Sequence, residues 1–181
     1  MYHSNTQQMI DYWRSKRGPQ GLPPRNAIDP TEFARLAPQS FILGRAASGL
    51  YPIRLVGGLI AELHGRDLRG LNFLALADDA GRRPLHASIE VCRRRPEPMI
   101  LRADGQTEQA SLPLEILLAP LAGTSGSPER LLGLYQPLAL VSSLGELPVR
   151  QLAVRSICGV GPANEESHQI RLATLDGRRV A

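Results

Sequence analysis

Histidines are the side chains in this sequence of 181 residues that could carry chemistry, because imidazole can ligate metals and haem or move protons. No two of them have the spacing of a metal-binding pair on one helix, and no thiol or carboxylate stands where it would complete a ligand set. The sequence therefore predicts neither a metal centre nor a histidine-based active site. The histidines are His3, His64, His86 and His168.

Serine and glycine motifs lead to the same expectation. The stretches "GSP" and "SSLG" do not supply the G-x-S-x-G turn that exposes a nucleophilic serine between a strand and a helix. The stretches "LVGG", "GLIAELHGRDLRG" and "CGVG" form neither a dinucleotide-binding fingerprint nor a phosphate-binding loop. We therefore expect a protein that is not an enzyme.

Arginine supplies nearly all of the positive charge. The formal net charge is +4 and the isoelectric point about 9.6, yet Lys16 is the only lysine. The densest cluster, Arg93, Arg94 and Arg95, stands where a predicted helix ends, and cations there complement the carbonyl dipole. Because no aromatic residues interleave with these arginines, a stacking groove for nucleic acid is not expected.

No signal for export or membrane insertion is present. The N-terminus "MYHSNTQQMIDYW" lacks a basic region followed by an apolar run, and no stretch has the roughly eighteen consecutive apolar residues of a membrane span. Cys92 and Cys158 lack the spacing of a zinc or thioredoxin-like site, which fits a reducing compartment. A cytoplasmic protein is the expectation.

An N-terminal helix should begin near Asn5 or Thr6 and end before "RGPQGLPPR". On this helix, Met9, Ile10 and Trp13 form one apolar stripe. The stripe can dock on the body of its own chain, or it can be an isologous contact in a homodimer or a contact with a signalling partner. We retain these three residues as the candidate dimer or partner contact.

The central region begins with a predicted hairpin. Residues 40–45 and 51–56 are its strands, with Ile53 and Leu55 on the same face. Gly57 and Gly58 let the chain leave the second strand sharply, so that helix backbone can approach the sheet. A helix of about two turns should follow and end at Gly65 in a left-handed cap.

A longer helix follows in "DDAGRRPLHASIEVCRR", where Leu85, Ile89 and Cys92 form a stripe suited to a sheet. The next stretch predicts two strands joined at Asp104–Gly105, a favoured turn dipeptide. "RLLGLYQPLAL" has leucines on both faces, as a central strand would. The tail contains one more extended stretch and a predicted hairpin at Asp176–Gly177.

This order predicts an α+β fold, in which helices cover one face of a five-stranded antiparallel sheet. We expect three regions along the chain. Residues 1–27 form the N-terminal helix and a linker, residues 28–140 the domain, and residues 141–181 a C-terminal extension of extended segments or a hairpin.

Several motifs in this order resemble a PAS-like family found mainly in alphaproteobacteria. They are "DYWRSKRG", "LPPRNAIDP", "LAPQSFIL", "IRLVGGLIAELHGRDLRG" and "LPLEILLAPL", and the resemblance runs from about Asp11 to Leu140. It implies a PAS fold, often one standing alone, with a role in sensing or signalling. Gly58 and His64 depart from the family pattern, because a small polar residue and an aromatic residue are usual at these two positions.

The resemblance also bears on cofactors. Photosensory relatives bind flavin through a cysteine that follows an asparagine, whereas Phe73 follows Asn72 here, so a flavin adduct is not expected. Haem-binding relatives supply a histidine from the long helix, and His86 is the candidate haem ligand on that basis. From the residues alone, a partly exposed His86 within reach of Glu90 is the simpler alternative.

Two functions remain open at this point. The first is a sensory or signalling adaptor that acts through protein contacts; the alternative is a protein whose function is to bind a small apolar molecule or haem. Either function could use an apolar pocket between the sheet and the short helices, although the same side chains could simply pack together. The candidate pocket residues are Ile53, Leu55, Leu59, Leu63, Phe73, Ile89, Met99, Leu101, Leu114 and Ile116.

Overall fold

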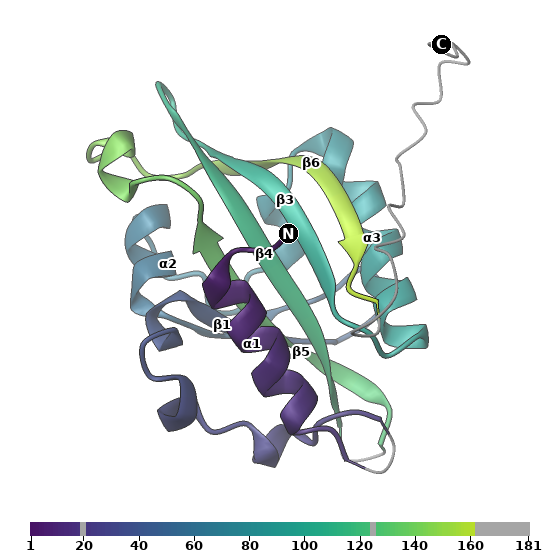
Figure 1. Cartoon of the computed structure of the whole chain (residues 1–181). Coiled ribbons are helices and arrows are strands. Elements are labelled where there is room, and N and C mark those ends of the chain that lie inside the picture. The colour runs from purple at the N-terminus through teal and green to yellow at the C-terminus, as the bar shows by residue number, and fades with distance from the viewer. Residues whose placement is uncertain (19–20, 124–125, 162–181) are drawn as a thin grey trace, which may run out of the picture.

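The computed structural model describes residues 1–18, 21–123 and 126–161 of the chain. A single antiparallel sheet of six strands runs through this part of the protein, in the order β2-β1-β5-β4-β3-β6 (Figure 1). The predicted α+β class is confirmed. The strands are β1 (Ser40–Gly44), β2 (Ile53–Val56), β3 (Met99–Gln106), β4 (Ser111–Ala122), β5 (Pro128–Pro137) and β6 (Gln151–Gly159).

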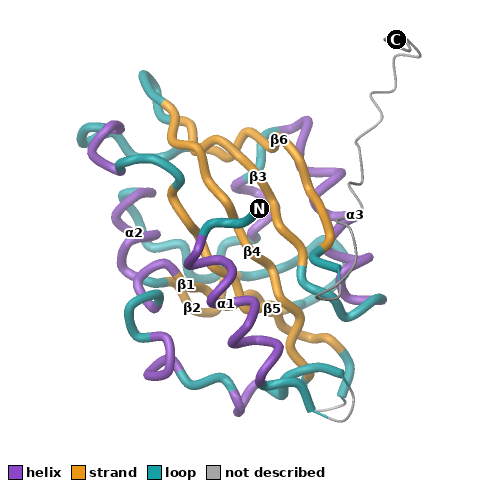
Figure 2. Tube along the Cα trace, in the orientation of Figure 1, coloured by secondary structure: helices purple, strands orange, loops and turns teal. Residues whose placement is uncertain are grey.

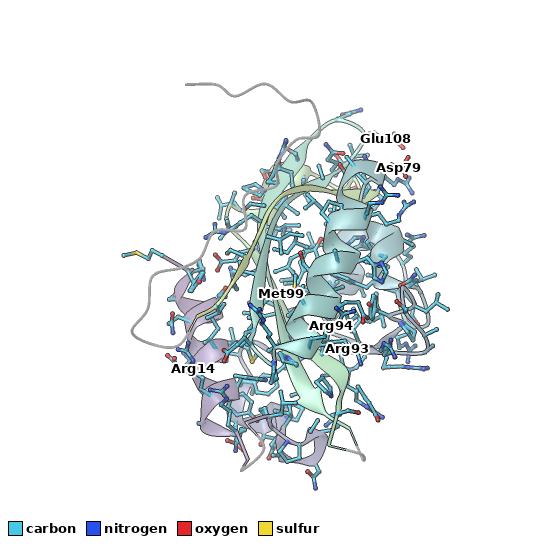
Figure 3. All side chains as sticks on the ribbon, turned by 90° about the vertical axis from the view of Figure 1, so that its right-hand side faces the viewer. Arg14, Asp79, Arg93, Arg94, Met99 and Glu108 are labelled. Atoms are coloured by element: carbon cyan, nitrogen blue, oxygen red, sulfur yellow. The ribbon has the colours of Figure 1, made fainter. Side chains whose placement is uncertain are left out.

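Helical segments cover both faces of this sheet, whereas the sequence predicted helices over one face (Figure 2). Figure 3 shows α1 and α3 on opposite sides of it. None of the helices in the described part combines the length and apolar character needed to cross a bilayer. The α-helices are α1 (Ser4–Ser15), α2 (Gly58–His64) and α3 (Asp79–Arg94); the 3-10 turns are η1 (Arg25–Ala27), η2 (Pro30–Phe33), η3 (Ala37–Gln39), η4 (Phe73–Leu76) and η5 (Val141–Leu144).

The sheet has one strand more than predicted. β6 pairs antiparallel with β3 over the whole length of β3, from Met99 opposite Gly159 to Gln106 opposite Gln151. The backbone N–H of Asp78, just before α3, donates to the carbonyl of Leu152 at 2.9 Å. The extended stretch of the C-terminal extension is therefore part of the same sheet. The predicted hairpin at Asp176–Gly177 lies outside the described residues.

The stripe of α1 packs on the sheet of its own chain. Met9, Ile10 and Trp13 are each 0% exposed, and the indole Nε1 of Trp13 donates to the carbonyl of Pro120 on β4 at 2.7 Å. The use of these side chains as a dimer or partner contact is thereby corrected, since their own sheet already covers them. Of the three contacts considered for this stripe, the structure has the one within the chain.

A buried carboxylate holds the first turn of α1. The helix begins at Ser4 with His3 as its cap, one or two residues before the predicted start. The backbone N–H of His3 donates to Oε1 of Glu115 at 2.9 Å, and Oε2 of Glu115 lies 2.5 Å from Nη2 of Arg102. Because Glu115 is fully buried, these partners supply the compensation that a buried charge requires.

The hairpin of β1 and β2 contains a β-bulge that the sequence did not predict. Ile42 pairs with Leu55 and Leu43 pairs with Ile53, so Arg54 has no opposite residue of its own. The extra residue reverses the alternation of the strand beyond it. Leu55 therefore points outward and is 43% exposed, which removes it from the predicted interior set.

The turn between β3 and β4 lies beyond the predicted position. Asp104 and Gly105 are both inside β3, and the chain reverses at residues 107–110. There the backbone N–H of Thr107 donates to the carbonyl of Ala110, and the Thr107 hydroxyl accepts the backbone N–H of Ala110. Gly105 serves packing instead, since a Cβ there would lie 3.0 Å from Leu114.

Two adjacent glycines at the entry to α2 have different surroundings. A Cβ added at Gly57 would overlap the backbone carbonyl oxygens of Ala37 and Pro38, whereas a Cβ at Gly58 would meet no atom within 4 Å. The backbone of Gly57 also donates to the carbonyl of Ser40 at 2.8 Å. The close approach of the start of α2 to the backbone of η3 therefore requires glycine at position 57 but not at position 58.

This difference predicts opposite outcomes for two single-methyl substitutions. Gly57→Ala should lower the free energy of unfolding by about 2 kcal/mol, because neither α2 nor the backbone of η3 can move aside without losing packing. The matched control, Gly58→Ala, should leave it unchanged or raise it by up to about 1 kcal/mol, since alanine favours the helix. Urea denaturation measures both, and equal effects would contradict this account.

Candidate functional site

The interior between the sheet and α2, η4 and α3 brings the predicted pocket residues together, apart from Leu55. They belong to one apolar cluster in which Phe73 stacks on Phe41, with ring centroids 5.5 Å apart. Leu59 is partly buried at its edge, and the others are no more than 5% exposed. These side chains pack against one another, as the simpler reading of the sequence expects, and their role as a ligand pocket stays a prediction.

A polar pair lies within this apolar cluster. Nε2 of His64, at the end of α2, is 3.2 Å from the hydroxyl of Tyr135 on β5, and the two rings meet edge to face at 5.8 Å. His64 is 3% exposed and Tyr135 is 1% exposed. Sequence reasoning noted His64 as a departure but missed Tyr135, which offered no signal among the leucines of its strand.

Burial decides the charge of this pair. It lowers the pKa of His64 to about 4 and raises the pKa of Tyr135, so both side chains are neutral at pH 7. The remaining ring nitrogen, Nδ1 of His64, is buried and has no hydrogen-bond partner among the described residues. The pair is thus a neutral hydrogen bond with an unused polar atom in apolar surroundings, an arrangement that tolerates added charge poorly.

The connection from β5 to β6 covers the end of α2 beside this pair. The backbone N–H of Val149 donates to the carbonyl of Leu63 at 2.7 Å, and Pro148 lies against Gly65, the left-handed cap of α2. A hollow of about 210 Å³ remains on the outer surface between this connection and α2. We call it the α2 hollow; its lining residues are Leu59, Glu62, Leu63, Val141, Leu144, Gly145, Glu146 and Leu147.

His86 lies outside the apolar interior. Its Nε2 is 3.3 Å from the hydroxyl of Ser48 in the loop between β1 and β2, and its ring is 6.1 Å from the ring of Tyr51. The side chain is half-buried and is not a member of the helix-side cluster. Its surroundings therefore do not favour a haem ligand that faces the interior, and the role of His86 stays a prediction.

Glu90, the expected partner of His86, is engaged elsewhere. It accepts the hydroxyl of Tyr51 and forms ion pairs with Arg93 at 3.2 Å and with Arg45 at 3.6 Å. Burial opposes ionisation of Glu90, but these partners outweigh it and lower its pKa. This network ties α3 to the hairpin of β1 and β2, and Arg93 stands in the last turn of α3 as predicted.

Asn72 and Phe73, which replace the asparagine–cysteine pair of flavin-binding relatives, are both used by the fold. Oδ1 of Asn72 accepts the backbone N–H of Tyr51 at 3.0 Å, and its Nδ2 donates to the carbonyl of Gly49 at 2.8 Å. The ring of Phe73 is 1% exposed and fills the interior. Position 73 therefore offers no thiol for a flavin adduct, and its side chain serves packing.

Exposed leucines gather around the edge strand β2. Leu55 is 43% exposed, Leu71 is 37% exposed and Leu50 is 49% exposed. They are close along the backbone, because the carbonyl of Leu71 accepts the N–H of Ile53, and Leu50 precedes Tyr51, whose carbonyl accepts the N–H of Phe73. We call these three residues the β2 patch. Within the described residues, no three His, Cys, Asp or Glu side chains form a metal-binding group.

The low pKa of His64 predicts acid sensitivity. An unfolded histidine titrates near pH 6.5 and the folded His64 near pH 4, so the unfolded state binds more protons between these values. Stability should therefore be complete above about pH 6.5 and fall by about 3 kcal/mol as the pH drops to about 4. Urea denaturation at several pH values measures this loss.

The double variant His64→Phe/Tyr135→Phe isolates this contribution, because it removes the imidazole without leaving the hydroxyl unpaired. Its stability should fall less than that of the original protein over the same pH range. His86→Gln is the matched control, and its stability should fall with pH by the same amount as that of the original protein. If stability depended on pH identically in the original chain and the double variant, the loss of stability in acid could not be assigned to His64.

Comparison with known proteins identifies the family of this chain. The family model described as "PAS domain" matches residues 1–136. Among solved structures, the chain is similar to a substituted variant of RsLOV, with 14% identity and a TM-score of 0.47 over 81% of this chain and 74% of that one. It is also similar to the LOV protein of Rhodobacter sphaeroides, with 14% identity and a TM-score of 0.45 over 64% and 73% of the two chains.

The PAS domain of BvgS from Bordetella pertussis is a further similar structure, with 16% identity and a TM-score of 0.45 over 65% of this chain and 92% of that one. No curated protein matches the chain. The resemblance to a PAS-like family is confirmed, while its bacterial group stays a prediction. Because the family model covers 136 of the 181 residues and the sheet has helices packed across it, the chain belongs to the PAS domain family.

Proposed function

We propose that this PAS domain is a non-enzymatic signalling adaptor that acts through protein contacts. PAS domains are generally sensory or signalling modules, which gives the class of function. The observation that supports the adaptor form is the distribution of apolar side chains. The interior cluster is packed with the chain's own residues, whereas the β2 patch exposes three leucines beside an edge strand. Apolar side chains that are exposed near one another favour association with another chain.

The chemistry of the described residues supports a role without catalysis. The Ser48–His86 contact, at 3.3 Å, has no third group that would orient the imidazole, and Ser48 is not on a strained turn after a strand. Cys92 is buried, and burial raises the pKa of its thiol to about 12, so it is not a thiolate at neutral pH. Both cysteines are free, which supports a cytoplasmic location as part of this proposal.

The β2 patch predicts which substitutions should abolish partner binding. In cells that produce the protein, Leu55→Asp/Leu71→Asp should lose a co-purifying signalling protein, because two charges would then have to be buried in the contact. The interior variant His64→Phe/Tyr135→Phe should retain the same protein at an unchanged level. Mass spectrometry of the affinity-purified complexes measures both, and circular dichroism checks that each variant is folded.

Native mass spectrometry of the purified full chain separates the adaptor from the small-molecule alternative. The adaptor should have the mass of the polypeptide alone, either as a monomer or as a homodimer that the β2 variant dissociates. A constant additional mass that is lost in the interior variant, together with partner capture that ignores the β2 substitutions, would refute the adaptor and favour a ligand-binding function.

A further inference from the structure

The bulge in β2 puts an arginine and a leucine side by side on one face of the sheet. Ile53 and Val56 both pack in the apolar cluster on the α3 side. Arg54 and Leu55 lie between them and are exposed. Leu55 is opposite Ile42, which belongs to the cluster on the α1 side, so its side chain lies on that side. A regular strand has one residue between two that face the same side, whereas the bulge puts two there.

Gly44 allows the side chain of Arg54 to lie across the neighbouring strand β1. A Cβ added at Gly44 would come within 2.9 Å of Nε and 3.3 Å of Cγ of Arg54. Leu43, the residue before Gly44, points into the cluster on the α3 side, so this Cβ position faces the α1 side. The stem of Arg54 therefore occupies the place of the missing side chain and holds the guanidinium close to the sheet.

A second arginine approaches Gly44 from the strand on its other side. Arg130 of β5 pairs with Gly44, and β2, β1 and β5 are consecutive strands of the sheet (Figure 2). Leu131, the next residue, points into the cluster on the α3 side, so Arg130 faces the α1 side. Arg54 and Arg130 are therefore neighbours on this face, next to the exposed Leu55.

Neither of these two arginines has an acceptor among the described residues. Arg54 and Arg130 form no ion pair and donate no side-chain hydrogen bond there, although both are exposed. In contrast, Arg45 and Arg155 pair with carboxylates elsewhere on the surface. An unpaired guanidinium offers a flat fork of N–H donors that matches a carboxylate. The surface around Leu55 thus combines apolar area with unused donors for anionic groups.

The charge of this surface indicates what kind of chain covers it. In an isologous dimer the surface would face its own copy, and Arg54 and Arg130 would meet like charges. Single-stranded nucleic acid would need exposed aromatic side chains for its bases, but the exposed apolar residues of the β2 patch are leucines. A segment that carries both carboxylates and aliphatic side chains complements the arginines and Leu55 together.

We propose that the β2 patch, together with Arg54 and Arg130, binds an acidic segment of another protein. Carboxylates of the segment accept the guanidinium N–H groups, and its aliphatic side chains cover Leu55. This inference rests on the proposed function, because it names the chemistry of the partner that the β2 patch binds. Its consequence is selectivity, since a basic segment of equal apolar character is repelled by the same two arginines.

Selection of displayed random peptides on the purified full chain tests the chemistry of the partner. The enriched peptides should contain Asp or Glu together with Leu, Ile or Val. The variant Arg54→Gln/Arg130→Gln, which keeps both side chains polar, should not enrich them. The matched control is Arg83→Gln/Arg94→Gln, which removes the same charge from exposed positions of α3 on the other side of the sheet (Figure 3). This control should enrich the same peptides as the original chain.

Fluorescence anisotropy with one enriched peptide, synthesised and labelled, then measures the affinity of each variant. Arg54→Gln/Arg130→Gln should bind the peptide about fivefold more weakly than the original chain, the effect of losing two exposed ion pairs. Leu55→Asp should abolish binding, because it puts a carboxylate where the peptide carries its own. Raising the salt concentration should weaken binding to the original chain more than binding to the arginine variant. Circular dichroism checks that each variant is folded.

Three outcomes would overturn the acidic partner. In the first, no acidic peptide is enriched, or acidic peptides bind the arginine variant as well as the original chain. In the second, the enriched peptides lack acidic residues and still lose binding on Leu55→Asp, which leaves the β2 contact of the proposed function standing. In the third, a labelled DNA oligonucleotide replaces the peptides as the ligand that the arginine variant no longer binds. Peptide binding that ignores both the arginine substitutions and Leu55→Asp would count against both proposals.

Discussion

The structure depends on the burial of both faces of its central strands. Successive residues of β4 point alternately into two apolar clusters, with Leu114 and Ile116 toward the α3 side and Leu117 and Ala119 toward the α1 side. A sheet in the middle of a domain can bury both faces only if two separate sets of residues cover it. Here the N-terminal segment forms one cover, and the helices between β2 and β3 form the other.

This constraint explains which parts of the fold the sequence could predict. The stripe of Met9, Ile10 and Trp13, the double-sided leucines of β5 and the cap at Gly65 follow from periodicity or backbone geometry, so they were found. Arg54 illustrates the opposite case. A bulge is decided by pairing with another strand, and no local pattern reveals that one residue lacks a partner.

The candidate sites were harder to predict than the fold, because they also depend on contacts between residues far apart in the sequence. His64 and Tyr135 are 71 residues apart and meet only because the fold brings the end of α2 to β5. The apolar set around Ile89 and Leu114 was identified correctly as a group, since hydrophobic periodicity shows which side chains face inward. Whether such a group leaves room for another molecule depends on how the side chains interlock, which periodicity does not contain.

One contact at the edge of the molecule joins the two ends of the described chain. Nη2 of Arg14, in the last turn of α1, donates to the carbonyl of Gly161 at 2.8 Å, two residues after β6 ends. Mechanical tension applied beyond Gly161 is therefore transmitted to the first helix as well as to the outermost strand. A force on one terminus would load both covers of the sheet, because β6 also contacts α3 on the other side.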